Sequence, residues 1–295
     1  MKKFSVLLAI LMVLLLAVSA SAQEVIFEMA DPIGDAKGDG NYTHPTSGDF
    51  GDRVAEMLDL TNFRVTDLGN KVEFRLSFAL EPNYVNPWGG GGLNFHRIDI
   101  YLVTGEEGGK TETFRDGAFV KFAEPWNKLI KVLDWDRSRI FTTSDDPADG
   151  DAGIGVSDDF TVKVEGKDIV ITVAKSIIGE IDQSTKYYVL VGHQCEFGDD
   201  NYRAVAEVAG EWQGGGGDDT NFNPNVYDML AETADEQYRQ LGSWEIGKLA
   251  VIKPVGGKSA GAAGSTTTII VVVVALVVIA GGVYFYMKKG KKVAA

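Results

Sequence analysis

An alternation of apolar and polar residues in segment 71–80 is the feature that most constrains the fold. Apolar side chains occupy every second position of the segment, at Val72, Phe74, Leu76 and Phe78. This period of two is typical of a β-strand with one buried face, since successive side chains of a strand point to opposite sides. A similar segment, 58–65, precedes it, and a turn at 67–70 separates the two. The sequence therefore predicts a hairpin that buries one face.

Further segments fit the same class of structure. In segment 95–103, Ile98, Ile100 and Leu102 lie on one side of an expected strand. Segment 125–135 fits a helical stripe as well as it fits a strand. A short helix is expected over 232–241. The other expected strands are 25–29, 160–164, 168–173, 187–191 and 203–208. Strands at this close spacing predict an all-β fold, an antiparallel β-sandwich.

The two ends of the chain carry patterns for export and membrane anchoring. Residues 1–22 combine two lysines, an apolar run and an Ala-Ser-Ala site, which predicts a secretory signal peptide. Residues 269–287 are apolar enough to cross a bilayer core of about 30 Å as a transmembrane helix, and the lysine-rich tail 288–295 follows. Because positive charge stays on the cytoplasmic side, we expect a single-pass protein of the cell membrane. Its domain, 23–255, and linker, 256–268, would be extracellular and its C-terminus cytoplasmic.

The charge of the exterior part excludes some classes of partner. All 42 acidic residues lie between the two apolar ends, together with 28 − 6 = 22 basic residues, so this part carries 22 − 42 = −20. Nucleic acids and anionic lipid surfaces need clusters of Lys and Arg, and we expect no nucleic-acid partner. Neutral glycans, cations and basic proteins remain. Cys195 is the only cysteine, so the domain has no internal disulfide.

The segment 31–42 has the composition of a cation-binding loop. Its glycines permit tight winding, and its carboxylates are spaced four residues apart, at Asp31, Asp35 and Asp39. Such oxygens suit a hard cation, and a structural Ca²⁺ is the expected cofactor. Further candidate ligands are Asn41 and Asp59. The spacing matches neither an EF-hand nor a glycine-rich repeat, so a solvated Asx turn without an ion is the alternative.

Two glycine runs, 89–92 and 214–217, each follow a tryptophan closely, Trp88 and Trp212. Neither run is followed by the Gly-Lys-Ser/Thr of a phosphate-binding loop. An exposed indole can stack on a sugar ring, and nearby polar groups can bind its hydroxyls. The polar candidates are Asn86, Asn94, Arg97 and Gln213. The alternative for each tryptophan is packing in the core.

These motifs together resemble a known family. The segments that carry the resemblance are 31–42, 86–101, 211–218 and 224–230. They are similar to the C-terminal domain of glucodextranase, which recurs in amylopullulanase-type envelope enzymes. The resemblance implies a sandwich of immunoglobulin or jelly-roll type, related to family-nine carbohydrate-binding modules and the DOMON group, that is accessory to catalysis. His44 departs from the family pattern, which has Tyr before the proline.

The function that the resemblance implies is non-catalytic binding of a carbohydrate of the α-glucan class at the cell surface. Carboxylate pairs such as Asp145-Asp146 follow from the acidic composition, and a glycosidase dyad is defined only by separation in space, so we do not expect an enzyme. Haem, which some DOMON relatives hold through His and Met, is not indicated by any spacing. The alternative is a structural envelope protein that contacts other surface proteins and binds no free sugar.

Overall fold

The computed structural model describes residues 23–85, 93, 95–134, 136–197 and 199–257. The chain divides into two units, Met1–Lys258 and Ser259–Ala295, and the second lies wholly outside the described residues. The same holds for the predicted signal peptide and transmembrane helix. Within the described residues, no helix has the length and apolar character that a membrane crossing requires.

The first layer is an antiparallel sheet of five strands. In spatial order these are β1 (Glu24–Ala30), β2 (Leu60–Asp67), β3 (Lys71–Phe78), β11 (Asp168–Ala174) and β10 (Phe160–Glu165). The predicted hairpin is formed by β2 and β3. Every second side chain of β3 is buried, because only one face of this sheet packs against the rest of the protein.

The second layer is a sheet of seven strands. Its order is β13 (Asp228–Met229), β12 (Lys186–His193), β4 (His96–Val103), β7 (Lys128–Val132), β8 (Arg139–Thr142) and β9 (Ile154–Gly155), with β15 (Val255–Gly256) paired to β12. The main core fills the space between the two sheets, where Phe74 and Leu76 share one cluster with Ile100 and Val189. The sheet extends to Gly256, the first residue of the predicted linker.

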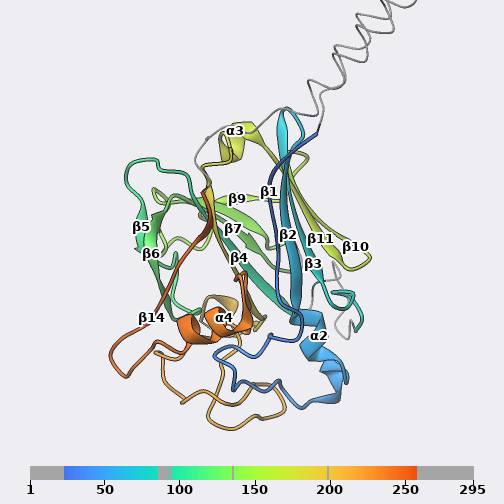
Figure 1. The fold of residues 1–295 in the computed structure, drawn as a ribbon, viewed down its shortest axis with the longest axis vertical. Helices are drawn as coiled ribbons and strands as arrows, with labels where there is room; N and C mark the ends of the chain where they lie inside the picture. Colours follow the sequence, from blue (N-terminus) through green and yellow to red (C-terminus); the bar gives the residue numbers. More distant parts are fainter. Residues whose placement is uncertain (1–22, 86–92, 94, 135, 198, 258–295) are drawn as a thin grey trace, which may run out of the picture. The chain divides into compact units, whose positions relative to one another are not determined.

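A third, smaller layer covers the other face of the second sheet (Figure 1). It consists of β5 (Lys110–Glu112), β6 (Val120–Trp126) and β14 (Ala250–Ile252), with β14 parallel to β6. A second core lies here, in which Tyr101 of β4 packs on Phe122 and Trp126. All eight residues of β4 are therefore buried.

The helices are short and lie at the ends of the strands. Thr233 caps α4 (Ala234–Leu241) by accepting a hydrogen bond from the backbone N–H of Glu236, which places this helix where the sequence predicts one. The remaining helical turns are η1 (Gly48–Phe50), α2 (Val54–Leu58), α3 (Lys175–Ile178) and η2 (Asp199–Asn201).

The predicted all-β class is confirmed, with a sandwich to which a third layer is added. The helical alternative for 125–135 is wrong, since β6 and β7 occupy 120–132. The predicted strand at 203–208 is also wrong: all six residues are described, and they form only a single bridge, between Val205 and Gly214. The reason is that successive residues bond to different partners: the N–H of Arg203 donates to the carbonyl oxygen of His193, that of Val205 to the side chain of Asn225, and that of Ala206 to the carbonyl oxygen of Gly214.

Candidate functional site

Three buried carboxylates meet where the first loop passes the second sheet. Asp31 directly follows β1, Asp35 lies four residues further along the loop, and Asp228 begins β13. One oxygen from each lies within 4.8 Å of the others. The residues are exposed by 5%, 1% and 0%, so three acidic groups share one region without solvent.

Most oxygens of this group have no hydrogen-bond partner in the part of the chain that the structure describes. Oδ1 of Asp31 accepts from the N–H of Ala231 at 2.8 Å, and Oδ2 of Asp228 accepts from the N–H of Leu60 at 2.7 Å. Among the described residues, the other oxygen of each and both oxygens of Asp35 are buried without a partner. Four carboxylate oxygens are thus available to a ligand.

Burial changes the acidity of all three groups. It raises the pKa of Asp31 to about 9 and that of Asp35 to about 7. The pKa of Asp228 is raised well above its ordinary value, first by burial and then by the carboxylates of Asp31 and Asp35. Keeping these three buried carboxylates ionised therefore costs free energy, and a nearby positive charge would reduce that cost.

The other residues that the sequence suggested as metal ligands have different partners. Both oxygens of Asp59 accept from the N–H of Gly34 at 2.9 Å, so this side chain shapes the loop. Oδ1 of Asp39 accepts from the N–H of Asn41 at 3.0 Å, which is the Asx turn of the alternative interpretation. The structure thus brings Asp31 and Asp35 together and leaves these three residues out of the group. The sequence reasoning missed Asp228, although it lies in the family-like segment 224–230.

The residues suggested for sugar binding divide into three sets. Asn86, Trp88 and Asn94 lie outside the described residues. Trp212 is 44% exposed, and its ring stands at 63° to that of Phe50, with 5.7 Å between the ring centres. Its neighbour Gln213 is exposed and lines a pocket.

This pocket has a volume of about 300 Å³ and a mixed lining. Phe197, which is 97% exposed, lines the pocket together with the polar residues Gln213, Asp219 and Asn221, and Tyr202 also contributes to the lining. An accessible ring with amide and carboxylate groups around it is an arrangement that can bind a polar ligand with apolar faces. The sequence reasoning missed Phe197; the signal was a lone aromatic residue in an otherwise polar segment.

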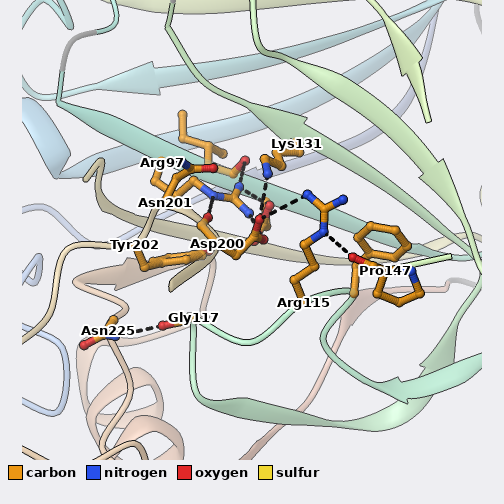
Figure 2. A network of polar contacts seen from close by, with 12 residues as sticks. Arg97, Arg115, Gly117, Lys131, Pro147, Asp200, Asn201, Tyr202 and Asn225 are labelled. Carbon is orange, nitrogen blue, oxygen red and sulfur yellow. Dashed lines mark hydrogen bonds and ion pairs between the residues drawn. The ribbon is translucent and has the colours of Figure 1, made fainter. Parts of the chain in front are cut away.

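Arg97, the remaining candidate, lies inside the protein, so its suggested contact with a surface ligand is wrong. Its guanidinium pairs with Asp99. It also donates to Asp200 at 2.9 Å (Figure 2). The amine of Lys131 donates to the same Asp200 carboxylate at 2.7 Å. The cause is segment 200–202, which lies against Arg97: the Nε of Arg97 also donates to the carbonyl oxygen of Asp200 at 3.1 Å.

This ion network supports the pocket through Tyr202. The hydroxyl of Tyr202 donates to Asp99 at 2.8 Å, and the guanidinium of Arg97 lies 4.7 Å from the ring centre. Burial, with the charge of Arg97, lowers the pKa of Lys131 to about 8, while Asp200 acts in the opposite direction. The network therefore holds segment 200–202, and the ring beside the pocket, in place.

The three histidines pack against other side chains of the fold: His96 and His193 are buried and His44 is half-buried. Nδ1 of His44 lies 3.1 Å from Nε2 of His193, and the ring of His44 stacks on Tyr227. His96 contacts the carbonyl oxygen of Met57 at 2.7 Å. Burial lowers the pKa of both His44 and His96 to about 4. His44, the departure from the family pattern, is thus part of an aromatic cluster.

One protein-family model matches nearly all of the residues that form this fold. The model of the C-terminal binding module of glucodextranase, described as SLH-like, matches residues 26–254. A search among curated proteins found no match. The matched range covers well over half of the chain and includes the three carboxylates and the pocket. The chain belongs to the family of SLH-like C-terminal binding modules of glucodextranase.

Proposed function

We propose that the protein is a non-catalytic module that binds a neutral carbohydrate of the α-glucan class at the cell surface. Its family is described as a binding module. The observation that carries the proposal is the pocket that is lined by both Phe197, which is 97% exposed, and Gln213. An aromatic ring that is held in water at the edge of a polar pocket supports stacking on a sugar.

The pocket supplies complementary contacts for such a ligand. The Phe197 ring would stack on the apolar face of a pyranose, while Gln213 and Asn221 would exchange hydrogen bonds with its hydroxyls. Trp212, on the same loop as Gln213, offers a second exposed ring. Each hydrogen bond contributes only about 1 kcal/mol net, and a stacked ring about 1–3 kcal/mol by analogy with nucleobases. We expect dissociation constants on the order of micromolar to millimolar.

The test is the binding of soluble α-glucans by the full chain, measured by retardation in affinity gels and by calorimetry. Phe197→Ala should weaken binding by about tenfold or more, which corresponds to about 1.4 kcal/mol, without changing the melting temperature. Ile246→Ala is a matched control, because it removes an 80% exposed apolar side chain that does not line the pocket. Trp212→Ala measures how much the second exposed ring contributes to the affinity for the glucan.

Two outcomes would contradict the proposal. Unchanged affinity in both Phe197→Ala and Trp212→Ala would show that the sugar binds elsewhere. If the unmutated chain binds no glucan, the alternative is favoured, in which the module is a structural envelope protein that contacts other surface proteins.

We also propose that residues 269–287 anchor the module in the membrane with residues 23–255 outside the cell. The support is the apolar composition of this segment and the lysines that follow it. Protease added to intact cells should cut the linker, 256–268, and release an acidic fragment, and deletion of 269–295 should yield a secreted soluble protein. Protection of the domain until the cells are lysed would reverse the orientation.

A further inference from the structure

We infer that Asp31, Asp35 and Asp228 bind one Ca²⁺ ion that joins the two main sheets. This site is separate from the proposed sugar pocket, since none of the three lines that pocket. Unlike the set suggested by the loop sequence, it includes a residue of the second sheet and leaves out Asp39, Asn41 and Asp59.

The first argument is the state of the carboxylate oxygens. A buried polar atom without a hydrogen-bond partner is rare in folded proteins, and here four such oxygens belong to three side chains that are each more than nine-tenths buried. A proton shared between Asp31 and Asp228 would satisfy only part of the group. Asp35 would still have two oxygens without a partner in the described part of the chain, whereas one cation would contact an oxygen of each of the three side chains, because these oxygens lie within 4.8 Å of one another.

The second argument concerns the type of ion. Every side chain in the group supplies oxygen, which excludes a preference for soft metals. Mg²⁺ usually keeps several waters in protein sites and demands near-ideal octahedral geometry, whereas Ca²⁺ takes six to eight oxygen ligands, from carboxylates, carbonyls and water, in flexible geometry. The near-complete burial of the three residues leaves little room for a hydrated ion. The site therefore favours Ca²⁺.

The third argument is the position of the site in the fold. Asp31 directly follows the edge strand of the first sheet and accepts from the N–H of Ala231, which follows β13 of the second sheet. Asp228 lies in the second sheet and accepts from the N–H of Leu60 in the first. The carbonyl oxygen of Asp35 accepts from the side chain of Gln237 in α4 at 2.6 Å. An ion at this junction would hold together segments from both ends of the domain.

The direct test uses the purified full chain, depleted of metal with a chelator and returned to CaCl₂. Elemental analysis should find one calcium per chain. The melting temperature, followed by tryptophan fluorescence, should rise by about 5–10 °C when the calcium concentration is about one hundred times its dissociation constant. Absence of bound calcium, or a melting temperature that does not respond, would overturn the inference and favour carboxyl groups that are simply protonated.

Variants assign the ligands. Asp35→Asn and Asp228→Asn keep the shape of each side chain and should both abolish the calcium-dependent rise. Asp39→Asn is the matched control: it makes the same change of charge in the same loop, it preserves the Asx turn, and the rise should persist. If Asp228→Asn does not fold, Asp35→Asn and the metal content of the unmutated chain decide the question. A rise that survives in Asp35→Asn, or an equal rise with Mg²⁺, would contradict the assignment.

Discussion

Replacement of Asp200 by Asn tests whether the ion network beneath the pocket is desolvated. The carboxylate of Asp200 lies 2.9 Å from the guanidinium of Arg97 and 2.7 Å from the amine of Lys131, whose side chains are 0% and 5% exposed. Arg115 approaches to 3.8 Å from a more exposed position. Asn retains the shape of Asp but removes its charge, so that Asp99 alone would balance two buried cations.

The expected cost follows from this geometry. Removal of one partner from a buried ion pair costs about 3–5 kcal/mol, and Asp200 serves two cations. Lys131 can avoid part of that cost by losing its proton. Its pKa is already lowered to about 8, so deprotonation at pH 7 costs only about 1.4 kcal/mol per pKa unit. We therefore expect a loss of about 3–4 kcal/mol in the free energy of unfolding, or about 6–16 °C in melting temperature.

The assay is equilibrium unfolding of the full chain in urea, followed by tryptophan fluorescence. Asp159→Asn provides the control, because its 65% exposed side chain approaches Lys71 only to 3.9 Å. Such a surface change should cost less than about 0.5 kcal/mol. A loss below about 1.5 kcal/mol for Asp200→Asn, with an unchanged urea dependence, would refute the view that the network is removed from water.

Lys131→Met should remove a pH dependence of stability. The folded pKa of Lys131, about 8, lies below the ordinary value of 10.5, so between these values the unfolded chain binds a proton that the folded chain has lost, and this group increases stability as pH rises. Urea unfolding at pH 7.5 and pH 9.5 should show this increase in the unmutated chain relative to the variant, and parallel behaviour would contradict it. Gly192→Ala should cost about 1–3 kcal/mol, because the added Cβ would lie 2.9 Å from the ring of Tyr202. Gly48→Ala, with no atom within 4 Å of the added Cβ, should leave the melting temperature nearly unchanged, and equal shifts in the two variants would argue against steric strain at Gly192.

Local patterns predicted the strands well where one face of a strand meets water. In β3 the polar positions are partly exposed and the apolar ones are buried, so the period of two reflects the environment directly. The pattern was misleading in β4, where Arg97 and Asp99 occupy the face opposite Ile98 and Ile100. Charged residues on a strand usually indicate solvent, but here they form a buried network of ion pairs with Asp200.

The candidate sites depended on tertiary structure in the same way. The composition of segment 31–42 pointed to a cation loop, and two of its carboxylates, Asp31 and Asp35, do lie together. Their neighbour Asp39 instead closes a turn with Asn41, because an Asx turn needs only a residue two positions away. A carboxylate that accepts such a short-range hydrogen bond is less available to bind a metal. The sequence does not indicate which carboxylates of the loop close a turn and which turn inward.

By itself the sequence determined the all-β class, the central hairpin and the resemblance to the family, because these depend on the order of residues along a strand or within a motif. The tertiary structure alone decided that Asp228 joins Asp31, that Phe197 and Gln213 line one pocket, and that Arg97 is buried. Each of these depends on two sheets and a covering layer that pack apolar faces together. Contacts between segments far apart in the chain decide which polar side chains lie together at the edges of that packing. A local periodicity contains no information about such contacts.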